Sequence, residues 1–163
     1  MPPKTYTDEE KFHHYMGIEL NNQTWALLTK KNRNDKDDLR MIRFAEGSLY
    51  HWLRSPMFEK INEQRGEWML SHVFAVLGKG DQALEAAEKC MALTEEFGYT
   101  DFDLGYALEG TARAYAACGN HERAIEYFER ANQVGQEIKK EKDRKLFLAD
   151  LTEGPWFDSG LPK

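Results

Sequence analysis

The stretch YALEGTARAYAAC (residues 106–118), followed at once by GNHERAIEYFERA (119–131), decides the fold of this chain. In both halves apolar residues recur at intervals of three and four, which is the spacing of one face of an α-helix. Between the halves, Gly119 is typical of the position just past a helix end, and Asn120 is typical of the cap of the next helix. Two helices joined by so short a turn must lie antiparallel and pack on each other.

The same arrangement occurs a second time upstream. The downstream positions are Ala112, Tyr115, Gly119, Ala124, Phe128 and Ala131. Their upstream counterparts are Ser71, Phe74, Gly78, Ala83, Ala87 and Cys90. Gly78 precedes Gly119 by 41 residues, and Ala83 precedes Ala124 by the same interval. The pattern resembles the tetratricopeptide repeat (TPR), which has a small residue and an aromatic on its first helix, Gly at the turn, and small and aromatic residues on its second.

This resemblance is strongest over residues 57–140, although the period exceeds the family's usual value of about 34 residues. It implies an all-α fold, an antiparallel helix-hairpin solenoid (a TPR-like superhelix) of about three helix pairs with a C-terminal capping helix. We expect one domain over residues 1–153 and a loose tail over 154–163. The expected parts are a degenerate first pair or N-terminal cap (7–54), a second pair (56–97), a third pair (100–140) and a cap (141–153).

Several local signals predict where these helices begin and end. The stretches Thr7–Glu10 and Thr100–Asp103 both fit the capping box that opens a helix. Pro56 is expected in the first turn of the helix that follows Ser55. Gln136 stands where the repeat often has Pro, so the helix after Asn120 can run on through the charged residues 139–145. Whether Trp156 packs on the body is left open.

Composition excludes some classes of partner. The chain has 163 residues, 31% of them charged, and a net charge of -6, which argues against nucleic acid as a ligand. Its first residues lack the apolar core of a signal peptide, and no run approaches the roughly 18 apolar residues of a membrane span. Cys90 and Cys118 fall on predicted inward faces and are expected to be buried thiols. We therefore expect a cytoplasmic protein with neither a nucleic-acid nor a membrane partner.

No catalytic motif is present, because the chain lacks a Gly-rich phosphate loop, GxSxG and HExxH. We therefore expect no cofactor and a non-enzymatic protein. An alternative hypothesis draws on the histidines, which are spread over four predicted helices. In that alternative a small-molecule or metal-dependent site, catalytic or not, lies between the first three helices, with His51, Arg65 and His72 as its polar members.

The resemblance also implies a binding surface, because the first helix of each repeat lines the concave groove. The residues that the register turns toward this groove are Arg65, Trp68, His72, Tyr106, Glu109 and Arg113. Guanidinium groups bind carboxylates as a fork and aromatics serve as rigid anchors, so this surface suits a peptide or protein segment, including an acidic one. The alternative is that Arg65 or Arg113 pairs with a carboxylate of the chain and ties neighbouring helices. His72 and Arg113 replace the Asn residues of the subfamily that clamps chaperone tails, so that ligand is not implied.

Tyr50, His51 and Trp52 are possible additional members of the groove. Three successive helical residues point about 100° apart, so they cannot all face one core. They can instead pack against the third helix, and exposed aromatics can also form a homodimer surface. The stretches YHW, RGEW and DFDL are similar to segments of small bacterial repeat proteins, a likeness that implies no activity.

Overall fold

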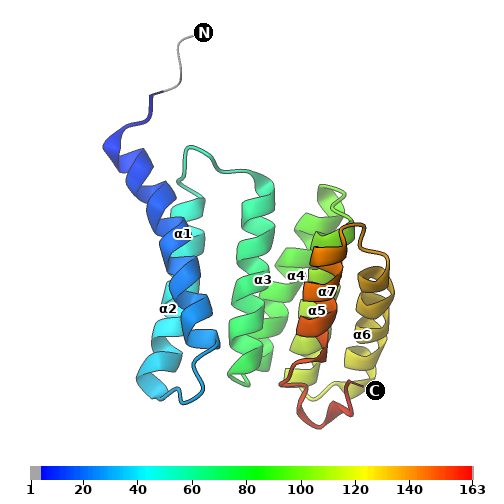
Figure 1. Ribbon diagram of the computed structural model, residues 1–163. Helices are drawn as coiled ribbons and strands as arrows, with labels where there is room; N and C mark the ends of the chain where they lie inside the picture. The colour runs from blue at the N-terminus through cyan, green and yellow to red at the C-terminus, as the bar shows by residue number, and fades with distance from the viewer. Residues whose placement is uncertain (1–4, 163) are drawn as a thin grey trace. The chain divides into compact units, whose positions relative to one another are not determined.

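A computed structural model describes residues 5–162, which form seven α-helices, one short 3-10 helix and no β-strand (Figure 1). The prediction of an all-helical chain is thus confirmed. The helices are α1 (Asp8–Leu28), α2 (Asp35–Trp52), α3 (Lys60–Val76), α4 (Gly80–Glu96), α5 (Asp101–Ala117), α6 (His121–Gln136), α7 (Glu141–Thr152) and η1 (Phe157–Ser159). Within the described range, no helix combines the length and the apolar character needed to cross a membrane.

The chain divides into two compact units, and the division falls inside α3, between Gly66 and Glu67. The first unit holds α1, α2 and the start of α3. The second unit holds the rest of α3 together with α4, α5, α6, α7 and η1.

In the first unit, α1 packs along α2. The predicted capping box opens α1: the Thr7 hydroxyl accepts a hydrogen bond from the Glu10 amide, and the Glu10 carboxylate accepts one from the Thr7 amide. The two helices approach closely at Gly17, where an added Cβ would lie 3.0 Å from the Trp52 ring. Ser48 Oγ donates to the Gly17 carbonyl at 2.7 Å in the same buried region. A small residue therefore sets the distance between these helices.

The prediction that Pro56 opens α3 is wrong, because α3 begins at Lys60. The residues before it form a turn in which the Ser55 hydroxyl accepts from the Met57 amide and the Ser55 carbonyl accepts from the Phe58 amide. Asn62 Oδ1 then accepts from the Glu59 amide at 2.8 Å. These local bonds satisfy backbone donors outside a helix, which delays its start by one turn.

In the second unit, α4, α5 and α6 pack on their neighbours in sequence order, and α7 contacts both α5 and α6 (Figure 1). The small residues at corresponding places of the two repeated stretches are buried: Ser71, Ala83, Cys90, Ala112, Ala124 and Ala131 are each at most 1% exposed. Gly78 and Gly119 both adopt the left-handed conformation that ends a helix, with φ of 70° and 77°. The two stretches thus share buried small residues and a left-handed glycine at matching positions.

Three further expectations are corrected in this unit. Thr100 makes no capping hydrogen bond, because Asp101 turns to φ 57° and its carboxylate accepts from the Lys139 amide. The helix α6 ends at Gln136 instead of running on, so that Ile138 can be buried. Cys90 is buried as expected, but Cys118 is exposed because it caps the end of α5.

The expectation of a loose tail is also wrong over the described residues. Trp156 is 3% exposed and Ser159 is 7% exposed, so the chain after α7 packs back onto the second unit. Lys163, the last residue of the expected tail, lies outside the described range.

Candidate functional site

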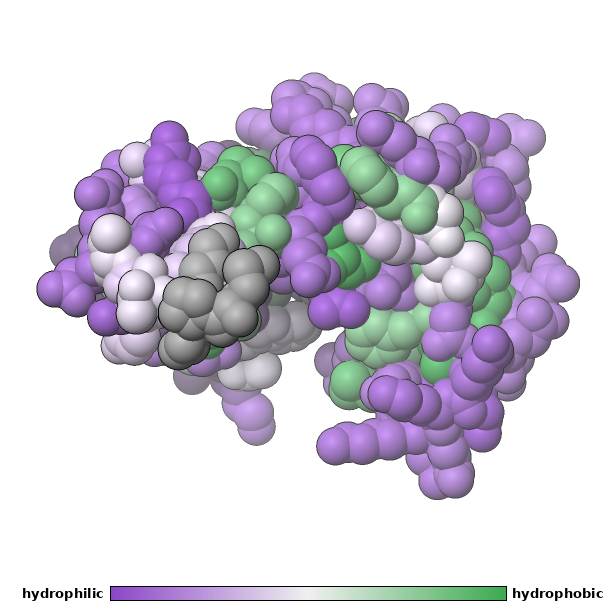
Figure 2. Space-filling model, turned by 90° about the horizontal axis from the view of Figure 1, so that it is seen from above, coloured by the Kyte–Doolittle hydropathy of each residue, from purple (hydrophilic) through white to green (hydrophobic). Residues whose placement is uncertain are grey.

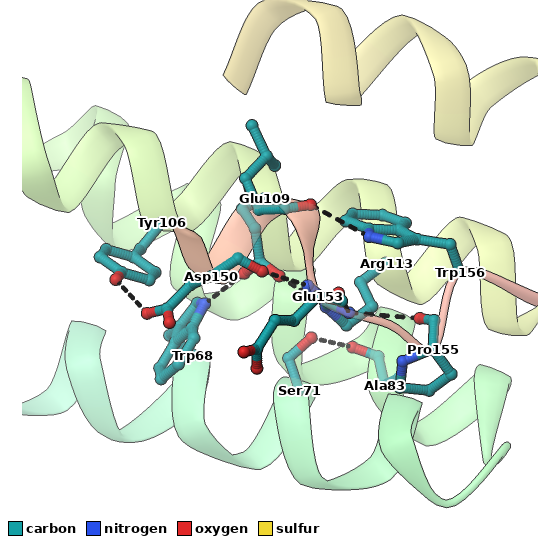
Figure 3. Close-up of polar contacts among 11 residues, drawn as sticks. Trp68, Ser71, Ala83, Tyr106, Glu109, Arg113, Asp150, Glu153, Pro155 and Trp156 are labelled. Carbon is teal, nitrogen blue, oxygen red and sulfur yellow. Dashed lines mark hydrogen bonds and ion pairs between the residues drawn. The ribbon is translucent and has the colours of Figure 1, made fainter. Parts of the chain in front are cut away.

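Five of the six residues predicted for the groove come together in the second unit. Trp68 and His72 lie on α3 with their rings stacked at 5.1 Å, and Trp68 meets the Tyr106 ring of α5 at 5.0 Å. Glu109 and Arg113 follow Tyr106 on the same face of α5, because residues three, four and seven apart share one side of a helix (Figure 3).

Glu109 is the acceptor at the centre of this group. Trp68 Nε1 donates to its Oε2 at 2.9 Å, and Arg113 Nε donates to its Oε1 at 2.6 Å. Glu109 and Arg113 are each 1% exposed. Burial, the largest single influence, works to raise the pKa of Glu109, but the charges of Arg113 and His72 and the hydrogen bonds from Trp68 and Arg113 together hold that pKa below its usual value. Near neutral pH the site therefore contains a buried ion pair.

The remaining donors of Arg113 bind the chain's own C-terminal strap, a name used here for residues 150–159. Nη1 donates to the carbonyl oxygens of Glu153 and Pro155 at 2.9 and 3.2 Å. Nη2 donates to the carbonyl of Asp150 at 3.3 Å. All three acceptors are main-chain oxygens, so these hydrogen bonds depend on the path of the strap rather than on its side chains (Figure 3).

Trp156 anchors the strap. The Arg113 guanidinium lies 4.2 Å from the centroid of its ring, and the Phe128 ring of α6 meets it edge-on at 5.1 Å. Its indole nitrogen donates to the Leu151 carbonyl at 3.1 Å. At the other end of the network, the Tyr106 hydroxyl donates to the Asp150 carboxylate at 2.6 Å. The strap therefore covers the face of α5 that was predicted to line a groove.

His72 adds a neutral imidazole to this site. Burial lowers its pKa to about 4, the Glu109 charge opposes this, and the Arg113 charge adds to it. At neutral pH the stacked His72 ring is therefore uncharged beside the Glu109–Arg113 pair.

The other predicted site residues belong to the first unit. Arg65 is exposed on α3 before the division of the chain. Tyr50 points outward, 49% exposed, with the Arg54 guanidinium 3.7 Å from its ring centroid. His51 turns toward α1, and Trp52 packs on Gly17. Tyr50 thus lies at the surface, while His51 and Trp52 both contact α1.

His51 has a partner that sequence reasoning missed. Its Nδ1 lies 2.8 Å from Nδ1 of His13 on α1, a hydrogen bond in which one imidazole donates and the other accepts. Burial, followed by the charges of His13 and Arg54, lowers the pKa of His51. The Glu9 carboxylate approaches the far nitrogen of His13 at 3.9 Å. No local pattern links residues 38 positions apart, so this pair had no signal in the sequence.

The first unit also exposes several large hydrophobic residues. They are Phe12, Tyr15, Ile18, Trp25, Leu39, Tyr50, Leu53 and Met57, each at least 38% exposed. In Figure 2, green and near-white residues gather among the purple ones on the part of the molecule that carries α1 and α2, at the left. The Phe12 and His51 rings lie 5.7 Å apart, and His51 meets Tyr50 at 5.2 Å, so part of this surface is continuous.

For the metal-site alternative, His51 and His72 lie in different units of the chain. Over residues 5–162, no group of three or more His, Cys, Asp or Glu side chains is arranged to hold a metal ion. Within the described residues, the structure thus shows no set of converging ligands that would support the metal-site alternative.

Comparison with protein-family models, with curated proteins and with solved structures finds no match to this chain. What the second-unit network can do must therefore be inferred from its own chemistry. That chemistry is the recognition of main-chain carbonyls by a fixed guanidinium, next to a buried aromatic anchor.

Proposed function

We propose that this chain is a non-enzymatic interaction module that binds a peptide segment on the α5 face formed by Tyr106, Glu109 and Arg113. One observation carries the proposal: this face already holds a segment of the chain itself, the strap, through three main-chain carbonyls on Arg113. A site that binds main-chain carbonyls can accept many sequences, because every residue carries one. An aromatic anchor such as Trp156 adds selectivity.

The arrangement of charges favours main-chain carbonyls over a second carboxylate. Glu109 already neutralises the guanidinium and fixes its orientation through Nε. The donors on Nη1 and Nη2, which bond to the carbonyls of the strap, are then positioned without further ordering of the side chain. Such preorganisation strengthens binding, because less conformational entropy is lost when the ligand arrives.

The proposal includes a TPR-like superhelix as the scaffold, with α3–α4 and α5–α6 as successive pairs. Its support is the burial of the small residues Ala83 and Ala124 at matching places and the shared left-handed turn at Gly78 and Gly119. In that architecture the first helix of each pair lines the concave surface, which is where the α5 face would lie. We also propose that the protein acts in the cytoplasm, with which the free thiols of Cys90 and Cys118 agree.

The test uses a chain shortened after Thr152 and a fluorescent synthetic peptide of residues 152–163. We expect the shortened chain to bind the peptide, with an affinity reduced about tenfold or more when the peptide carries Trp156→Ala. Circular dichroism checks that the shortened chain is folded. A shortened chain that is folded but does not bind the peptide would contradict the proposal. If shortening prevents folding, the full chain can be folded first and then cut at a protease site inserted after Thr152. The measurement is then whether the cleaved C-terminal fragment stays bound to the rest of the chain.

A second candidate function is self-association through the exposed hydrophobic surface of the first unit. Phe12 and Tyr50 are 55% and 49% exposed and connected through His51, and Arg54 lies over Tyr50. Aromatic and Arg residues are enriched at the centres of protein interfaces. Light scattering should give the mass of a dimer that Phe12→Ser converts to a monomer. A monomeric mass for the unaltered protein would count against it.

A further inference from the structure

We infer that the strap is a built-in competitor for the proposed peptide site, displaced by a partner segment that repeats its recognition chemistry. The partner is a peptide segment that offers the main-chain carbonyls of residues i and i+2 to Arg113 and an aromatic side chain at i+3. In the strap these positions are Glu153, Pro155 and Trp156. This inference rests on the proposed function and adds its regulation and its ligand class.

The receptor side of the contact does not depend on the strap. Arg113 is held by Glu109 on its own helix, and Glu109 is held by Trp68 of α3. None of these three residues belongs to residues 150–159. When the strap leaves, the guanidinium keeps its carboxylate partner, and the Nη donors stay directed toward the space that the carbonyls occupied.

The strap side depends on few buried groups. Beyond the end of α7 at Thr152, Trp156 and Ser159 are the buried residues, while Glu153 and Gly154 are exposed. Phe157, next to the anchor, is 41% exposed. Segments with few buried apolar contacts open at a smaller free energy than the whole unit. Release of the chain after Thr152 thus depends mainly on the withdrawal of Trp156, with Leu161 also packed on the core. Asp150 and the buried Leu151 belong to α7 and stay in place.

The buried ion pair lowers the free energy needed for this release. Burying Glu109 and Arg113 removes both charges from water, a penalty that their attraction offsets only in part. Opening the strap lets water return to the pair without separating it, since its two members lie on the same helix. An apolar contact of the same area would gain no such favourable hydration on opening.

The experiment measures binding of the fluorescent peptide of residues 152–163 to the full chain. Trp156→Ala should raise the affinity of the full chain for the peptide about tenfold or more, because its own strap then competes less well. The matched control is Phe157→Ala, which alters the exposed neighbour and should leave the affinity as in the unaltered chain. Ser159→Ala removes the hydroxyl that donates to the Trp156 carbonyl at 2.6 Å and should give a smaller rise.

The outcomes separate the two proposals. If the shortened chain binds the peptide but Trp156→Ala binds it no better than the unaltered full chain, the strap does not compete and the further inference is wrong. If the peptide binds neither the shortened chain nor any full-length variant, the proposed function is wrong as well. Thermal unfolding of each variant identifies one that does not fold. Should Trp156→Ala fail in this way, Ser159→Ala provides the same comparison.

Discussion

Arg113 donates from Nε to the Glu109 carboxylate at 2.6 Å across one turn of α5, and each of the two residues is 1% exposed. At the surface such an i,i+4 pair contributes little, because water solvates both charges in either state. In this protein the pair is enclosed by Trp68, the strap and Trp156, so each charge depends on the other. Removing either member of the pair would therefore leave the other charge buried without its partner.

The first prediction concerns this pair. Glu109→Ala should lower the free energy of unfolding by about 3–5 kcal/mol, because it leaves the Arg113 charge buried without its carboxylate. Urea denaturation measures the change. Glu85→Ala is the matched control, since Glu85 and Lys89 form an i,i+4 pair with both side chains more than half exposed, and it should change stability by less than about 1 kcal/mol. Equal effects of the two substitutions would contradict the enclosed site.

The second prediction concerns acid sensitivity. In the folded protein His72 has a pKa of about 4, whereas in the unfolded chain a histidine titrates near 6.5. Between these values the unfolded chain binds more protons, so the stabilisation is complete above pH 6.5 and is lost as pH falls toward 4. We expect a loss of about 2 kcal/mol, less than the full shift implies because His72 keeps some exposed surface. His72→Gln should flatten the stability profile between pH 6.5 and about 5; an unchanged profile would show that His72 is not the group responsible.

The third prediction concerns the histidine pair of the first unit. Burial lowers the pKa of His51 first, and the charges of His13 and Arg54 lower it further. His13→Gln removes one of these charges, so it should raise the pKa of His51 toward its ordinary value without reaching it. NMR titration of the imidazole resonances measures the shift. In the control His14→Gln the pKa of His51 should not move, because His14 bonds to Ser55; equal effects of the two variants would exclude a direct pair.

The fourth prediction concerns the packing of α7 against α6. A Cβ added to Gly135 of α6 would collide with the ring of Phe147, which is fully buried. Gly135→Ala should therefore destabilise the protein by about 1–3 kcal/mol, although alanine favours helix. At Gly47 an added Cβ meets only the terminal methyl of Leu20, which can move aside. Gly47→Ala should be neutral or slightly stabilising in thermal unfolding, and a similar loss in both variants would show that Gly135 is not a close contact.

Much of the local structure could be predicted from the sequence, because it depends on residues near one another in the chain. The spacing of Ala112 and Ala124 around Gly119 indicated two packed helices, and both alanines are fully buried. The capping box at Thr7 was predicted for the same reason. The box at Thr100 failed because Asp101 bonds to Lys139, a residue 38 positions away.

The sequence by itself thus determined which segments are helices and which residues share the face of α5, since a period near 3.6 places Tyr106, Glu109 and Arg113 together. Only the tertiary structure decided what this face binds. Arg113 meets the carbonyl of Pro155 across 42 residues, and His13 meets His51 across 38. Such contacts depend on the path of the chain through several turns. Every residue carries a main-chain carbonyl, so no local sequence pattern shows which carbonyls Arg113 binds.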